Sequence, residues 1–336
     1  MKGTTHRALH FWTAPALHFS TDVYRPRMPD PSDDKTLVFY LREARSKAAQ
    51  AAKLEALYLL KSLKPELLKG GPLSDRGSVF WVRPLAPSED LRAIDYQRLG
   101  YSEAVDLLVP IPEGMFRENR ADMTRFKGKA LKVDRLYERD AVAERERDPD
   151  QRLFHLATPD GVREVRGYRG DGSPFGRRAL PVCDALLLVN IVDPGVGKTL
   201  LDPFAGAGGI VQKAVRVGLV TVTVDLDPIL APGLERMGAR HQTGDARNLP
   251  IDDESVDAIA TEPPFSTETR AWIAQVFEEM FRVLKPGARL AIYCADWQAE
   301  SLRVQGKTRP LRPLLDVPID RKGSPCDILA WEKEEW

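Results

Sequence analysis

The residues with the clearest chemical signal lie in a glycine-rich segment of the C-terminal half. The segment LLDPFAGAGGI (200–210) places an apolar run directly before Asp202 and before a loop that contains Gly206, Gly208 and Gly209. Glycines let a loop turn tightly and let its backbone approach a bound nucleoside closely. The pattern predicts a nucleoside-binding loop between a strand and a helix, but NAD-dependent enzymes also have such loops, so the kind of nucleoside stays open.

Two carboxylates follow the loop at spacings that suit a nucleoside. The predicted strand VTVTVDLDP ends at Asp225, about 20 residues after the loop, where a carboxylate can accept hydrogen bonds from both ribose hydroxyls. Asp227 is the alternative residue for this role. Asp245, in the segment GDARNLP (244–250), follows a third predicted strand and is placed to meet an adenine amino group, the alternative being an ordinary turn residue.

A fourth predicted strand, VDAIATEPPF, ends in Glu262, Pro263, Pro264 and Phe265, a combination that does not suit a dehydrogenase. With these motifs together, the sequence resembles class I S-adenosylmethionine-dependent methyltransferases, and more closely their amino-methylating branch. Members of that branch have an acidic or amide residue, two prolines and an aromatic residue at the end of the fourth strand. The segments DPFAGAGG, GDARNLP and GRRALPVCDALLLVNI resemble those of tRNA guanosine-N2 methyltransferases, which often carry a THUMP RNA-binding domain.

The resemblance covers about 120 residues, 174–285 and the strand that follows, and it implies a role for each matching position. The residues that would bind the methionine end, the ribose and the adenine of S-adenosylmethionine are, in chain order, Asp202, Phe204, Gly206, Gly208, Gly209, Asp225, Asp245 and Ala246. Phe175 or its neighbours would cover the methionyl part.

On the substrate side, Glu262 and the carbonyl of Pro263 would accept hydrogen bonds from a base amino group, with Pro264 stiffening the loop and Phe265 stacking on the base. The sequence departs from the family at Glu262, where Asp or Asn is usual, and at Phe265, where tyrosine is usual. No convincing THUMP pattern is present in the N-terminal half.

These residues need a scaffold of alternating strands and helices. We expect strands at TLLDPF, VTVTVDLDP, VDAIATEPPF, ARLAIYCAD and DILAWEK, and helices at 182–192, 209–217 and 272–284. Such alternation predicts an α/β fold, a Rossmann-like seven-stranded methyltransferase sheet with ligands at the carboxyl ends of its strands. Residues 171–336 form this predicted domain, and 1–170 a smaller α+β region, with GYRGDGSPFG (167–176) as linker.

Within the N-terminal region the clearest predicted helix covers 37–63, and strands are expected at SVFWVRPL and VDLLVPI. The stretch 116–147 interleaves Lys and Arg with Phe126 and Tyr137, which suits either RNA recognition or a solvated helical face. Residues 1–180 contain 32 Lys and Arg against 26 Asp and Glu, whereas 181–336 contain 17 against 23. This asymmetry indicates an anionic partner for the N-terminal region, although an uneven scatter of solvated charge is the alternative.

The composition is that of a soluble globular protein: 43% of the 336 residues are hydrophobic, 29% are charged and the formal net charge is zero. Three isolated cysteines and the lone histidines His155 and His241 show no metal-binding spacing, so no metal site is expected. No signal sequence or membrane span is recognised, and we expect a cytoplasmic protein.

The predicted function is methylation of a base amino group, most of all guanosine N2 in tRNA. The alternatives are a DNA adenine or cytosine amino methyltransferase, and a cofactor-binding module that has lost catalysis and binds RNA or protein.

Overall fold

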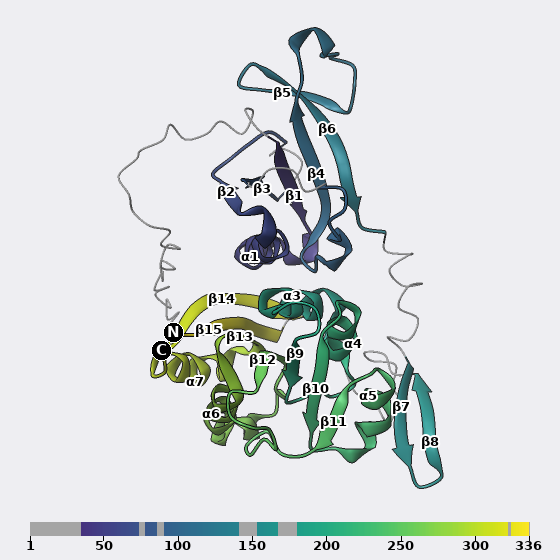
Figure 1. Cartoon of the computed structure of the whole chain (residues 1–336), viewed down its shortest axis with the longest axis vertical. Coiled ribbons are helices and arrows are strands. Elements are labelled where there is room, and N and C mark those ends of the chain that lie inside the picture. Colours follow the sequence, from purple (N-terminus) through teal and green to yellow (C-terminus); the bar gives the residue numbers. More distant parts are fainter. Residues whose placement is uncertain are drawn as a thin grey trace, which may run out of the picture.

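The computed structural model of the chain describes residues 35–73, 78–85, 91–140, 153–166, 180–321 and 324–335. Figure 1 shows two sheets, one above the other, with helices α1 and α3 between them and a separate two-stranded hairpin beside α5. The predicted linker (167–176), which contains Phe175, and the predicted domain boundary at residue 170 lie outside the described residues.

The N-terminal sheet is antiparallel and six-stranded, in the order β2-β3-β1-β4-β6-β5. Its strands are β1 (Thr36–Leu41), β2 (Pro65–Leu68), β3 (Val79–Pro84), β4 (Ser102–Pro110), β5 (Met123–Phe126) and β6 (Lys129–Glu138). Short 3-10 helices lie between them, namely η1 (Glu43–Ala48), η2 (Lys61–Leu63), η4 (Tyr96–Arg98) and η5 (Glu113–Met115). The expectation of an α+β region is thereby met over these residues.

The long helix predicted for 37–63 is wrong in its first part. The segment Thr36–Leu41 is the central strand β1, and all six of its residues are buried because β3 and β4 flank it and both faces of the sheet are covered. A short run of continuous apolar residues reads equally well as a buried strand and as a buried helix. The alanine-rich remainder does form a helix, α1 (Ala49–Leu59).

The basic stretch that begins at Phe116 forms a hairpin up to residue 138, and the alternative of a helical face is wrong there. Strand β5 pairs with β6 from Met123 opposite Lys132 to Phe126 opposite Lys129. Residues 141–147 of the stretch lie outside the described residues. Figure 1 shows this hairpin at the end of the molecule opposite the C-terminal sheet.

The C-terminal sheet has seven strands in the order β11-β10-β9-β12-β13-β15-β14. Strands β9 to β13 are mutually parallel, and β15 runs antiparallel to both of its neighbours. The strands are β9 (Thr199–Asp202), β10 (Val220–Asp225), β11 (Arg240–Thr243), β12 (Val256–Thr261), β13 (Leu284–Ala295), β14 (Leu311–Arg321) and β15 (Ser324–Lys333). The predicted Rossmann-like α/β sheet is confirmed.

Helices cover both faces of this sheet, as the alternation of its side chains requires. Leu200 and Ala258 face a core with α3 (Val182–Val192) and α4 (Gly209–Arg216), whereas Leu201 and Ile259 face α6 (Ile273–Val283) and α7 (Asp296–Lys307). Other short helices are η7 (Pro228–Leu230), α5 (Ala231–Arg236) and η8 (Thr267–Ala271). The predictions for α3, α4 and α6 hold to within a residue or two. Helix α7, strand β14 and the hairpin of β7 (Leu153–Thr158) and β8 (Gly161–Arg166) were not predicted.

Helix α3 joins the two sheets. It contacts α1 of the N-terminal part on one side and α4, β12 and β13 on the other. Its residues from Asp184 to Val192 are all buried, as expected for a helix that is enclosed on every side. Gly100 lies so close to it that a Cβ on this residue would be 2.2 Å from the carbonyl oxygen of Cys183. The two sheets therefore share one continuous core.

Two buried carboxylates fix this junction. Glu55 of α1 accepts hydrogen bonds from the backbone N–H groups of Gly100 (2.6 Å) and Tyr101 (3.0 Å) and from Nδ2 of Asn190 (2.8 Å). Asp184 of α3 pairs with Arg45 at 2.9 and 2.7 Å and accepts a hydrogen bond from the Tyr101 hydroxyl at 2.9 Å. Burial raises the pKa of Glu55, partly offset by these donors. Both carboxylates bond across the junction, so its alignment is specified by polar contacts as well as by packing.

We predict that Glu55→Ala lowers the free energy of unfolding by about 3 kcal/mol or more, because each of three buried donors loses its acceptor at about 1–3 kcal/mol apiece. Urea denaturation followed by tryptophan fluorescence measures the change. Glu43→Ala, at an exposed position in η1, is the matched control and should shift the midpoint little. Equal effects of the two substitutions would contradict the role given to Glu55.

Candidate active site

The predicted site residues gather at the carboxyl ends of the parallel strands. Asp202 ends β9, Asp225 ends β10, and Thr261, which directly precedes Glu262, ends β12. Strands β9 and β12 are neighbours, and the chain order reverses between them. In open α/β sheets this switch point is where ligands bind. The fold thus brings together residues that are up to 60 positions apart in the sequence.

Asp202 is the most deeply buried of the predicted site carboxylates, with 1% of its surface exposed. Its Oδ1 accepts a hydrogen bond from Thr261 Oγ1 at 2.7 Å and one from the backbone N–H of Phe204 at 3.2 Å. Burial raises the pKa of Asp202 to about 7, with a smaller contribution from the negative charge of Asp225. Asp202 is therefore a carboxyl group that titrates near neutrality and links the end of β9 to the end of β12.

The glycine loop takes the shape that its composition predicts. Gly206 and Gly208 both have positive φ, +49° and +81°, which other residues adopt only with strain. A Cβ on Gly208 would lie 2.7 Å from Sδ of Met237. The N–H of Gly206 donates to Asp225 Oδ2 at 2.8 Å, and Gly209 opens α4. The loop is thus tied to the next strand and presents its backbone at the sheet edge.

Both candidate ribose-binding carboxylates accept backbone hydrogen bonds, Asp225 two and Asp227 one. Asp227 forms the cap of the following short helix. Its Oδ1 accepts from the N–H of Ile229 at 3.1 Å and caps η7, while its own N–H donates to Asp225 Oδ1 at 3.0 Å. Asp225 lies at the strand end beside the glycine loop. By its position at the strand end beside the glycine loop, Asp225 stays the predicted ribose-binding residue, with Asp227 as the alternative.

Asp245 is partly exposed and paired with Arg247. The guanidinium donates to both carboxylate oxygens, at 3.0 Å from Nε to Oδ1 and 2.5 Å from Nη2 to Oδ2, and this pairing lowers the pKa of Asp245. Arg247 also lies over the ring of Trp272, which stacks on Phe204 at a centroid distance of 6.1 Å. Next to Asp245, Ala246 is buried in the core. The sequence motifs assign no role to Arg247, although it lies within the GDARNLP segment, and Trp272 belongs to no recognised motif.

The Glu-Pro-Pro-Phe segment is fixed by residues of the following strand and helix. Pro263 is buried and Glu262 half-buried, whereas Pro264 is exposed and its carbonyl accepts from Nε2 of Gln298 at 3.0 Å. Gln298 itself is fully buried and accepts from the N–H of Ala295 at 2.9 Å.

The aromatic ring of this segment has a partner within the protein. Phe265 stacks on Tyr293 of β13, with a centroid distance of 6.4 Å and an interplanar angle of 4°. Tyr293 is fully buried, so it sets the plane of the Phe265 ring. Neither Gln298 nor Tyr293 was predicted from the sequence, since both lie about 30 positions further along the chain.

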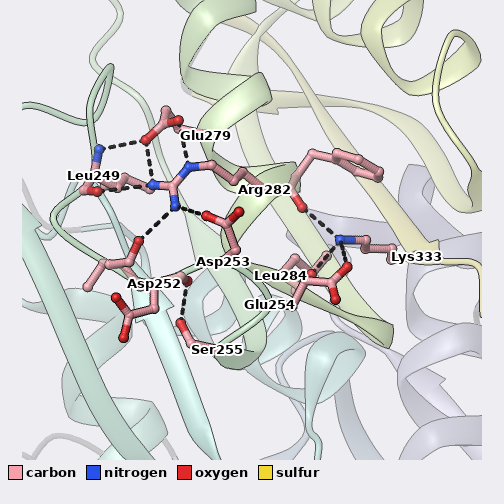
Figure 2. Close-up of polar contacts among 11 residues, drawn as sticks. Leu249, Asp252, Asp253, Glu254, Ser255, Glu279, Arg282, Leu284 and Lys333 are labelled. Carbon is pink, nitrogen blue, oxygen red and sulfur yellow. Dashed lines mark hydrogen bonds and ion pairs between the residues drawn. The ribbon is translucent and has the colours of Figure 1, made fainter.

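The connection between β11 and β12, which carries Asp245, is held by α6 (Figure 2). Leu249 donates its N–H to Glu279 at 2.8 Å, and its carbonyl accepts from Arg282 at 3.1 Å. Arg282 also donates to the carbonyl of Ile251 at 2.9 Å. Nearby, the buried ammonium of Lys333 donates to the carbonyl of Leu284 at 2.8 Å and pairs with Glu254. These contacts fix residues 249–254 of the connection against α6 and the end of β15.

In the described ranges, no group of His, Cys, Asp and Glu side chains is arranged to hold a metal ion. The three cysteines are free thiols. None of the helices in this part of the chain combines the length and the apolar character that a membrane crossing requires.

We predict that the stability of the protein falls as pH rises from about 4 to 7 through the contribution of Asp202. The folded state holds this proton up to its pKa of about 7, whereas the unfolded chain releases it near 3.8. The contribution is at most about 1.4 kcal/mol per pH unit and is fully lost above pH 7. Urea denaturation at several pH values measures it. The difference in free energy of unfolding between wild type and Asp202→Asn should change across this pH window. The same difference for the exposed Asp252→Asn should not change with pH. A flat difference for Asp202→Asn would contradict the raised pKa.

Comparisons with known proteins identify the type of domain that this sheet forms. Residues 201–292 match the family model described as methyltransferase domain. The chain is 32% identical over 152 residues to a tRNA (guanine(10)-N2)-dimethyltransferase of Pyrococcus abyssi, covering 39% of this chain and 45% of that protein. It is 33% identical over 112 residues to a demethylmenaquinone methyltransferase of Paenarthrobacter aurescens, covering 32% and 42%.

A solved structure of geranyl diphosphate methyltransferase in complex with S-adenosylmethionine superposes with a TM-score of 0.39 at 17% identity, covering 46% of this chain and 86% of that one. The chain spans less than half the length of the two curated relatives named above. Together with the strand order, the family match shows that the C-terminal sheet is a class I methyltransferase domain with S-adenosylmethionine as its cofactor, and that it resembles the domain of tRNA guanosine-N2 methyltransferases.

Proposed function

We propose that this protein transfers a methyl group from S-adenosylmethionine to an exocyclic amino group of a nucleic-acid base, with guanosine N2 of cytoplasmic tRNA as the substrate. One observation carries the proposal: the nucleoside-type loop after Asp202 and the acceptor-bearing segment at Glu262 leave neighbouring strands, and the hydrogen bond between Asp202 and Thr261 joins them. A cofactor in the loop and a base beside Glu262 would therefore meet.

The residues present fit the cofactor. The loop has no room for a side chain at Gly208, because a Cβ there would lie 2.7 Å from Sδ of Met237. Asp202 would pair with the methionine ammonium, whose positive charge would favour the ionised carboxylate, and Asp225 would accept from the ribose hydroxyls. Asp245 would meet the adenine amino group, sharing its oxygens with Arg247. When bound, the cofactor supplies an electrophilic methyl group.

The residues at the end of β12 would do the remaining work on the base. A base amino nitrogen is a poor nucleophile because its lone pair is delocalised into the ring, and acceptors that hold its protons favour a tetrahedral nitrogen. Glu262 and the carbonyl of Pro263 are such acceptors. Holding two reactants in line can contribute roughly 7–11 kcal/mol. Since Gln298 pins the segment, the acceptors are fixed before the base arrives.

Phe265 would stack on the base. Tyr293 covers one face of its ring, so the base would lie on the other face. Stacking of this kind is worth about 1–3 kcal/mol per base and needs no hydroxyl group. A phenylalanine in place of the usual tyrosine therefore keeps the stacking interaction. The choice of tRNA rests on the names of the relatives and on the basic N-terminal region, and we assign residues 1–170 to substrate recognition and 171–336 to catalysis.

The test is transfer of label from radioactive S-adenosylmethionine to bulk unmodified tRNA, followed by nucleoside analysis. We predict label in N2-methylguanosine, and a loss of roughly 100-fold or more in rate for Glu262→Ala, the size of effect that misplacing a reactant by about 1 Å can produce. Cofactor binding, measured by calorimetry, should change less than about threefold.

Two controls sharpen this test. Glu268→Ala removes an exposed carboxylate six positions further along and should keep full activity. Glu262→Asp installs the shorter carboxylate usual in the resembling family and should retain transfer. Unchanged transfer in Glu262→Ala would contradict the assigned role. Label in DNA but not in tRNA would favour a DNA amino methyltransferase, and cofactor binding without transfer to any nucleic acid would favour a binding module.

A further inference from the structure

We infer that the tip of the β5–β6 hairpin binds the phosphate backbone of the substrate RNA at a point remote from the methylated base. The hairpin tip is defined as residues 113–132, which comprise η5, β5 and the start of β6. This inference rests on the proposed function and adds to it a second contact site for the same RNA.

The charge of the hairpin tip is the first observation. Its 20 residues contain six Lys and Arg against three Asp and Glu, whereas the C-terminal part from residue 181 carries more acidic than basic residues. Five of the six cations are exposed: Arg117, Arg120, Arg125, Lys127 and Lys129. Arg117 donates to the backbone carbonyls of Gly114 and Phe116, so these contacts do not neutralise its charge. Arg120 and Arg125 are paired with Asp122 and Glu113, and the hairpin tip keeps an excess of three cations over carboxylates. An excess of exposed cations of this kind binds phosphates.

The backbone at the apex is the second observation, and it is independent of the charge. Phe126 and Lys129 are paired, and the two residues between them, Lys127 and Gly128, have φ of +48° and +82°. A two-residue turn with both φ values positive favours Asn-Gly or Asp-Gly. A lysine in the left-handed region costs about 1 kcal/mol or more. The strained conformation therefore carries an exposed cation in the turn of the hairpin, where asparagine would fit with less strain.

Aromatic rings lie among these cations. The guanidinium of Arg125 lies 4.1 Å from the centroid of the Phe116 ring, and Nζ of Lys127 lies 5.3 Å from that of Phe126. Next to Phe116, the side chain of Met115 is 61% exposed. Cations combined with planar and apolar surfaces are what proteins use to bind unpaired nucleotides, through phosphate contacts and base stacking. The hairpin tip has both.

The position of the hairpin tip determines what it can bind. Figure 1 shows it at the end of the molecule opposite the carboxyl edge of the C-terminal sheet. The buried contacts of Glu55 and Asp184 align the two sheets. A small methyl acceptor in the site could not reach the hairpin tip, whereas a folded RNA could contact both. The geometry therefore points to a large anionic substrate that lies along the length of the protein.

The experiment compares RNA binding by wild type and by a double variant, Lys127→Asn with Lys129→Gln. Affinity for a fluorescein-labelled unmodified tRNA transcript is measured by anisotropy at salt concentrations from about 50 to 200 mM. Each lost phosphate contact should reduce the slope of log affinity against log salt by about 0.7–0.9, so the slope should become shallower by roughly 1.5. We also expect roughly tenfold weaker binding at about 0.1 M salt. Because asparagine tolerates the left-handed region, the melting temperature should not fall.

The matched control is Arg240→Gln with Lys307→Gln, which removes two exposed cations from the C-terminal part of the chain. It should keep the wild-type slope. Equal slopes and affinities in wild type and in the Lys127/Lys129 variant would overturn the inference. Equally tight binding of polyglutamate that depends on the two lysines would also overturn it, in favour of an acidic protein partner.

The binding assay requires no methyl transfer, so the two proposals can fail separately. Lysine-dependent tRNA binding without label transfer would leave the hairpin tip as an RNA contact and refute the enzymatic proposal. Label transfer to tRNA with an unchanged KM in the double variant would support the enzymatic proposal and refute the hairpin tip as an RNA contact. Absence of tRNA binding by the wild type would refute both.

Discussion

The hydrogen bond between Thr261 and the buried carboxyl group of Asp202 is the contact on which the site depends. It joins the ends of β9 and β12, the two parallel strands between which the chain order reverses. The loop after β9 has the form of a nucleoside-binding loop, and the segment after β12 carries the residues that we propose as acceptors for a base. An ionised carboxylate in this buried position costs stability, because burial favours the neutral form of the group. Buried polar groups of this kind are retained where a site needs them.

The rest of the C-terminal part supports that junction from outside. Gln298 of α7 holds the carbonyl of Pro264, and Arg282 of α6 holds the connection that carries Asp245. On the other face of the sheet, α3 packs against β12 and β13 and is itself bonded to the N-terminal part through Asp184 and Asn190. The elements around the site are therefore positioned by polar contacts to elements far away in the sequence. Rigid support of this kind is what keeps acceptors oriented towards a reacting atom.

The sequence was sufficient to predict where the chemical groups lie, because their spacing follows strand ends. Asp202, Asp225 and Glu262 each end or follow a predicted strand, and the carboxyl ends of parallel strands meet at one edge. The supporting residues could not be predicted. Gln298 and Arg282 carry no motif and become neighbours of the site only through the packing of α6 and α7. The sequence of β1 predicts a helix and the structure has a strand there, since a buried apolar run has no diagnostic period.

The most direct test of the account is a crystal structure of the protein with S-adenosylhomocysteine bound. We expect the ribose to lie against Asp225, the amino acid end to lie at Asp202 and the glycine loop, and the sulfur to point towards Glu262 and Pro263. A ligand bound elsewhere, or one whose sulfur points away from the end of β12, would contradict the claim that this edge brings a methyl donor and a base amino group together.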